Sequence, residues 1–146
     1  MAARRPEAAP LDRPLPALAK LRLAAEVLAA YPRARYAARH TDIRSTMRQL
    51  RRKQKKTPAA TDPESLGRAR RVGRAVHQTL APLPVDSRCL TQSLVLTELL
   101  ARRGVETRLV IGVRPGQDFG AHAWVELDGE PLLPAGGGEF HRLIDL

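Results

Sequence analysis

The sequence predicts an α+β fold in which a helical N-terminal layer covers a short antiparallel sheet. Apolar residues recur at helical spacing up to Arg103, and after Gly104 they alternate with a period of two. A chain of 146 residues also suits a single hydrophobic core, so we expect one domain overall. Within it we expect a flexible arm at 1–16, a basic helical region at 17–84 and the core at 85–146.

Three helices are predicted before the middle of the chain. The first covers 17–30 and is expected to end before Pro32, because proline cannot donate the backbone hydrogen bond of a helix interior. The second covers about 41–53, and the third begins near Asp62 and ends before Pro82. The apolar stripe of the first helix consists of Leu18, Leu21, Ala25 and Leu28.

A fourth helix is predicted at 88–103, with Asp86 or Ser87 as its N-cap and Gly104 as its stop. Its apolar residues form a wide stripe that we expect to be buried. These residues are Leu90, Leu94, Leu96, Leu99 and Leu100.

The remainder of the chain is typical of an antiparallel sheet. Residues 109–113 and 121–127 alternate as strands, and the Asp128-Gly129 pair favours a two-residue hairpin, so 130–133 should return as a third strand. The glycine run 136–138 is expected to be a flexible connector. The second strand places apolar residues on one face, and the other face carries His122, Trp124 and Glu126.

Cys89 is the lone cysteine, which excludes an intramolecular disulfide and metal sites built on several thiolates. It falls in the first turn of a predicted helix, where unpaired N–H groups and the helix dipole favour a thiolate. The same N–H groups could bind the oxyanion that forms when a carbonyl is attacked. Cys89 is therefore our candidate nucleophile.

His122 is the candidate base. The opposite face of its strand is wholly apolar, so the face that carries His122 is expected to pack against a different part of the protein. The helix that begins near Cys89 is one possibility. The other histidines, His40, His77 and His141, lie in no such setting and are expected at the surface or as caps.

Four sequence blocks resemble the B-type leader peptidases of lasso-peptide biosynthesis, a transglutaminase-like cysteine protease family. The blocks read RCLTQSL at 88–94, LLARRGV at 99–105, LVIGV at 109–113 and GAHAWVELDG at 120–129. The resemblance is close over about 86–134 and looser over the basic helical part.

The resemblance implies a transglutaminase-like (papain-like) core that cuts a precursor between leader and core peptide through a thioester. It implies Cys89 as nucleophile and His122 as base, with no cofactor and no metal. The implied partners are the leader of the precursor, a separate leader-recognition protein and a ring-closing cyclase. In that family an acid about twelve residues after the histidine completes the site, and Pro134 stands there.

The group that orients His122 is therefore open. The hairpin places residues 133–135 opposite His122, and none of their side chains can orient an imidazole. Gln92, Glu139 and a backbone carbonyl are the alternatives. A Cys–His pair without an acid can still form an ion pair, although its rate could be lower.

Trp124 is expected to pack beside the site, with its ring as a candidate lining of the substrate groove.

The basic region at 44–56, with Arg68, Arg70, Arg71 and Arg74, has three interpretations: a solvated helical face, a docking surface for an acidic leader or a partner, or a nucleic-acid surface. Nucleic acid is disfavoured, because only Tyr31 and Tyr36 lie nearby for base stacking.

The chain is expected to be cytoplasmic, since it has neither a signal-peptide core nor an apolar run long enough to span a membrane.

Two further functions remain open from the sequence. One is a catalytically idle scaffold of a peptide-maturation complex, which the proline at 134 would suit. The other is a basic nucleic-acid-binding protein, which the net charge of +10 would suit.

Overall fold

The computed structural model describes residues 14–53, 63–83, 88–117, 119–134 and 139–146. In this part of the chain, helices come first and an antiparallel sheet follows, as expected for an α+β fold. The elements are α1 (Ala17–His40), α2 (Ile43–Lys53), α3 (Pro63–Leu80), α4 (Arg88–Arg102), β1 (Arg108–Arg114), β2 (Gly120–Leu127), β3 (Glu130–Pro131) and β4 (His141–Asp145). The predicted helix start at Asp62, the predicted N-cap at Asp86 or Ser87 and the glycine connector lie outside the described residues.

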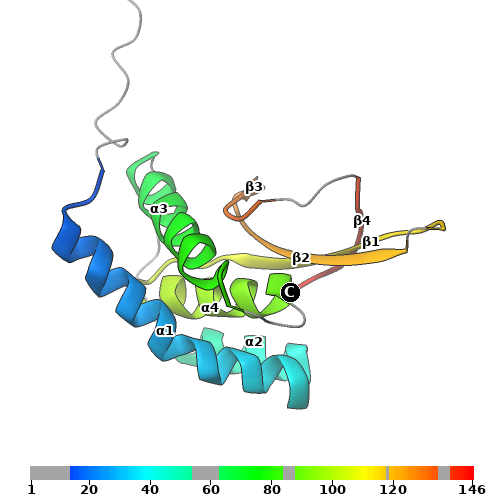
Figure 1. Ribbon diagram of the computed structural model, residues 1–146. Coiled ribbons are helices and arrows are strands. Elements are labelled where there is room, and N and C mark those ends of the chain that lie inside the picture. The colour runs from blue at the N-terminus through cyan, green and yellow to red at the C-terminus, as the bar shows by residue number, and fades with distance from the viewer. Residues whose placement is uncertain (1–13, 54–62, 84–87, 118, 135–138) are drawn as a thin grey trace, which may run out of the picture.

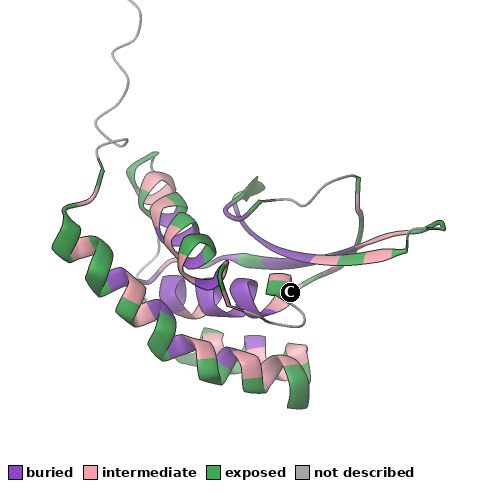
Figure 2. Ribbon diagram, in the orientation of Figure 1, coloured by how far each residue is buried: buried purple, intermediate pink, exposed green. Residues whose placement is uncertain are grey.

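Helix α4 lies at the centre of the molecule. It contacts α1, α2 and α3 as well as β1 and β2, and Figure 1 shows it between α1 and α2 below and the sheet above. Residues 91–97 of this helix are all buried, and Figure 2 shows α4 buried over most of its length. The predicted stripe is confirmed, although Leu90 is only half-buried. Gly104 follows with φ of 75°, a conformation that glycine adopts without strain and that ends the helix as predicted.

Helix α1 is longer than predicted, because it continues through Pro32 to His40. Proline removes one helical hydrogen bond, but the segment beyond it remains helical where Ala34 is buried and Ala37 and Ala38 pack against the core. The prediction that Pro32 ends the helix was therefore wrong, because tertiary packing outweighs a local cost.

The apolar stripe that the sequence shows on α1 is not the face that packs. Leu18, Leu21 and Leu28 are 67%, 69% and 50% exposed, and Figure 2 shows exposed residues along the outer side of α1. The buried face consists of Leu23, Val27, Ala30 and Ala34. Small residues on this face allow α1 to approach α4 closely.

Helix α2 starts after Asp42, whose carboxylate accepts hydrogen bonds from the backbone N–H of Ser45 (3.2 Å) and from its hydroxyl (3.1 Å). These bonds, the hydroxyl bond foremost, hold the pKa of Asp42 below its usual value. Met47 is the buried residue of this helix, and Ile43 and Leu50 pack partly against the core.

The strand order in the sheet is β3-β2-β1-β4, with antiparallel pairing throughout. The Asp128-Gly129 turn has φ of 52° and 83°, which confirms the predicted hairpin. Strand β3 ends at Pro131 rather than at residue 133, because proline cannot donate to the ladder and the next two leucines turn inward to be buried. Strand β4 was not predicted; it pairs with β1.

Candidate active site

Cys89 occupies the first turn of α4, as predicted, and its half-buried side chain packs against the core. The first N–H groups of a helix have no partner within it, so this end can receive negative charge. Arg88 ties the helix start to the end of the preceding segment, because its guanidinium donates to the carbonyl oxygen of Leu83 (3.2 Å).

His122 lies near the start of β2 and is held from three sides. Its Nε2 atom is 3.2 Å from the backbone carbonyl oxygen of Pro134. The ring of Trp124 stacks beside it with centroids 5.9 Å apart, and the ring of Phe140 lies at 5.3 Å. Pro134 therefore lies opposite His122, as the hairpin predicted, and a main-chain atom makes the contact, while residue 135 lies outside the described residues.

Cys89 and His122 lie on elements that contact each other, since α4 packs against β2. Ala123 and Val125 belong to the core that α4 shares, and His122 alternates with them, so its ring is on the other face of the strand. Among the hydrogen bonds of the described residues, none joins the Cys89 sulfur to the His122 ring. The meeting of the two groups remains a prediction.

Trp124 is buried, with 8% of its surface exposed, and its indole Nε1–H donates to Oε1 of Glu126 (2.8 Å). Its packing beside the candidate site agrees with the sequence, and its place in a substrate groove stays a prediction. Arg142 of β4 reaches the same carboxylate with its closest contact at 2.9 Å and also donates to Asp145 (3.1 Å). The bonds to Glu126, and then those to Asp145, raise the pKa of Arg142 above its usual range.

Gly112 lies opposite His122 on the neighbouring strand β1. A Cβ atom at this position would lie 2.9 Å from the ring of Trp124 and 3.0 Å from Cβ of Phe140. The missing side chain therefore gives these two rings the space in which they flank His122.

In the described part of the chain, two of the candidate orienting groups, Gln92 and Glu139, form no hydrogen bond with His122. Gln92 lies one turn after Cys89 and is 6% exposed, and its side-chain nitrogen has no hydrogen-bond partner there. Glu139 is exposed, and no hydrogen bond to the imidazole is found for it.

Sequence reasoning missed Phe140, Gly112 and Arg142. A glycine within an otherwise apolar strand signals close approach of another group, so Gly112 could have been noticed. Phe140 and Arg142 offered no such signal, because their role depends on β4 returning to pair with β1.

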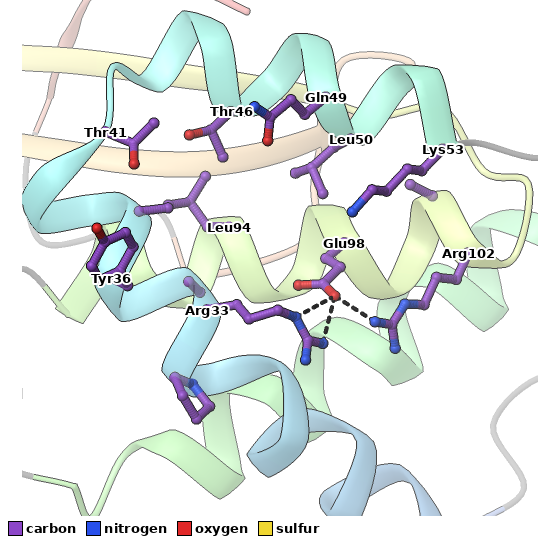
Figure 3. A pocket seen from close by; sticks show the side chains of 14 residues that line it. Arg33, Tyr36, Thr41, Thr46, Gln49, Leu50, Lys53, Leu94, Glu98 and Arg102 are labelled. Carbon is purple, nitrogen blue, oxygen red and sulfur yellow. Dashed lines mark hydrogen bonds and ion pairs between the residues drawn. The ribbon is translucent and has the colours of Figure 1, made fainter.

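A separate groove of about 540 Å³ lies between α1, α2 and α4. Figure 3 shows Glu98 at its base, with Arg33 and Arg102 both donating to one carboxylate oxygen at 2.7 and 2.6 Å. Lys53 lies at the rim. Neither Cys89 nor His122 lines the groove, so it is not the candidate active site.

Within the described ranges, no three metal-ligating side chains gather closely enough to hold an ion. None of the helices there combines the length and the apolar character that crossing a bilayer requires.

The comparisons with known proteins agree with this architecture. Residues 27–145 match the model of the transglutaminase-like superfamily. A segment of 49 residues, 34% of this chain, is 48% identical to the microcin J25-processing protein McjB of Escherichia coli, and it spans 23% of the length of that protein. No solved structure matches. Because the superfamily model covers most of the chain, with helices followed by an antiparallel sheet, the protein belongs to the transglutaminase-like superfamily.

Proposed function

We propose that this protein is a cysteine peptidase that removes the leader from a ribosomally made precursor during lasso-peptide maturation. The observation that carries the proposal is the lone cysteine in the first turn of α4, a helix that packs against the strand bearing His122. The superfamily membership and the partial identity to a processing protein support it.

In the proposed reaction, His122 takes the thiol proton of Cys89, and the thiolate attacks the carbonyl carbon of the last leader residue. The backbone N–H groups at the start of α4 stabilise the oxyanion. The imidazolium then gives its proton to the leaving amine, which becomes the N-terminus of the core peptide. Water hydrolyses the remaining thioester and frees the leader acid and the thiol.

This chemistry requires the sulfur and the imidazole to approach within about 3 to 4 Å. Because the ring of His122 lies on the face of β2 opposite the one that packs against α4, the proposal requires Cys89 and His122 to meet around the edge of β2, with movement of one of the two side chains when substrate binds. The precursor, a separate leader-recognition protein and a ring-closing cyclase are the proposed partners.

The test is incubation of the purified chain with a leader-bearing precursor and the recognition protein, with release of the leader followed by mass spectrometry. We expect Cys89→Ala and His122→Ala to abolish release, because each removes a reacting group. His141→Ala, an exposed position on β4, serves as the matched control and should retain wild-type turnover. Release that survives Cys89→Ala would overturn the proposal.

Thiol reactivity separates this proposal from the idle scaffold. Because the chain has one cysteine, iodoacetamide labels Cys89 specifically among thiols. We expect labelling faster than that of free cysteine between pH 5 and 8, and slower labelling in His122→Ala. A thiol no faster than free cysteine, together with no leader release, would favour the scaffold.

A further inference from the structure

His122 faces the backbone carbonyl of Pro134, a residue whose side chain cannot orient an imidazole. The Pro134 carbonyl oxygen lies 3.2 Å from Nε2 of His122, at the sequence position where an orienting carboxylate was expected. A carbonyl oxygen can only accept a hydrogen bond, so the bond requires the proton to be on Nε2. The neutral ring then has its lone pair on Nδ1.

We propose that the Pro134 carbonyl replaces the orienting carboxylate and holds His122 as the Nε2–H tautomer, with Nδ1 left to accept the proton of Cys89. This inference rests on the proposed function and adds a positioning residue to it. In Cys–His and Ser–His enzymes the third group acts in this way, by fixing tautomer and ring direction without taking the proton itself.

The carbonyl is held by the segment that precedes it. The backbone N–H of Leu132 donates to the carbonyl oxygen of Val125 (2.8 Å), and Leu132 and Leu133 are both buried. Gly73 of α3 lies directly against the Leu132 carbonyl, where even a methyl group would not fit. The proline ring further restricts the backbone at 134. The acceptor is therefore anchored to both the sheet and α3.

The imidazole is held equally firmly. Trp124 and Phe140 flank it, and the hydrogen bond from Trp124 to the buried Glu126 fixes the indole in turn. Among the described residues, no hydrogen bond of His122 other than that with Pro134 is found. A ring flanked in this way has little freedom to turn Nδ1 toward the carbonyl instead.

A neutral acceptor has a chemical consequence. Hydrogen bonds to charged acceptors are about twice as strong as those between neutral groups, so a carbonyl stabilises an imidazolium less than a carboxylate does. We therefore expect the wild-type chain to be an active peptidase, and a carboxylate introduced at position 134 to increase its kcat.

The direct test is ¹⁵N NMR of the full chain labelled at histidine, with the His122 signals assigned by their loss in His122→Ala. We expect the neutral ring to carry its proton on Nε2 and that proton to exchange slowly with water, whereas the exposed His141 on β4 should exchange fast. A proton on Nδ1 of His122, or exchange as fast as that of His141, would overturn the inference.

Kinetics supply the second test. Pro134→Ala keeps the carbonyl, and Glu139→Gln removes the nearby acid that the sequence left open, so both should stay within about three-fold of wild-type kcat. Pro134→Asp should extend activity to higher pH, with kcat changed more than KM. A large loss of kcat in Glu139→Gln would assign the role to that carboxylate. If wild-type chain releases no leader, the proposed function fails, while the NMR result still decides the tautomer.

Discussion

At the scale of single residues, the candidate site depends on what Gly112 lacks. The ring of Trp124 and the Cβ atom of Phe140 occupy the space that a side chain at this position would fill, and the rings of both residues lie against His122. Glu126 sets the indole through a hydrogen bond from its Nε1–H. Gly112, a buried residue on β1, thus determines how the imidazole is surrounded although it has no side chain to contact the ring.

Gly112→Ala should displace Trp124 and Phe140, because its Cβ would lie 2.9 Å from the ring of Trp124 and 3.0 Å from Cβ of Phe140, closer than ordinary van der Waals contact. We expect a destabilisation of about 1–3 kcal/mol by urea unfolding and a lower kcat. Trp124 is the only tryptophan, so its fluorescence reports this site alone. An unchanged emission spectrum with wild-type kcat would show that the rings do not depend on Gly112.

At the scale of elements, α3 packs against the segment after β3 at Gly73. Gly73 packs against the Leu132 carbonyl, and the same short segment presents the Pro134 carbonyl to His122. A helix with no residue in the candidate site can therefore affect it.

Gly73→Ala should move the segment that follows β3, since the added methyl would collide with main-chain atoms. We expect lower stability although alanine favours helix over glycine by about 1 kcal/mol, and a fall in kcat larger than any change in KM. Gly67→Ala adds the same methyl to the same helix about 9 Å away along its axis and is the matched control. Equal effects of the two changes, measured by urea unfolding and leader release, would argue against this coupling.

At the scale of the whole molecule, the net charge of +10 should affect how fast charged ligands bind, which can be measured. The helix α2 contributes several exposed cations, and the groove between α1, α2 and α4 has Arg33, Lys53 and Arg102 around a single carboxylate. Such a field raises the encounter rate of acidic ligands and is screened by salt.

For a precursor with an acidic leader, we expect kcat/KM to fall by about ten-fold between 50 and 500 mM NaCl, with kcat unchanged, because the charge acts on encounter and not on chemistry. A precursor with the same cleavage site and a neutral leader is the control and should change little. Equal salt effects on both would contradict charge-driven capture. Salt-sensitive binding of random duplex DNA would favour the nucleic-acid interpretation instead.

Much of the local architecture follows from local rules. The four helices were predicted because their apolar residues recur every three to four positions, and the strands β1 and β2 because theirs alternate. The Asp128-Gly129 turn was predicted because it needs two residues that tolerate positive φ. Cys89 at a helix start and His122 on the less apolar strand face come from the same patterns.

The sequence alone was sufficient for the four helices, the strands β1 and β2 and the hairpin, and it indicated Cys89 and His122 as the candidate nucleophile and base, since each of these depends on neighbours within a few positions. Only the tertiary structure decided that α1 continues through Pro32, that β4 completes the sheet and that a main-chain oxygen faces His122. The physical reason is that packing against distant elements can outweigh a local preference, and that a backbone carbonyl is present at every residue, so no sequence pattern distinguishes the one that serves a site.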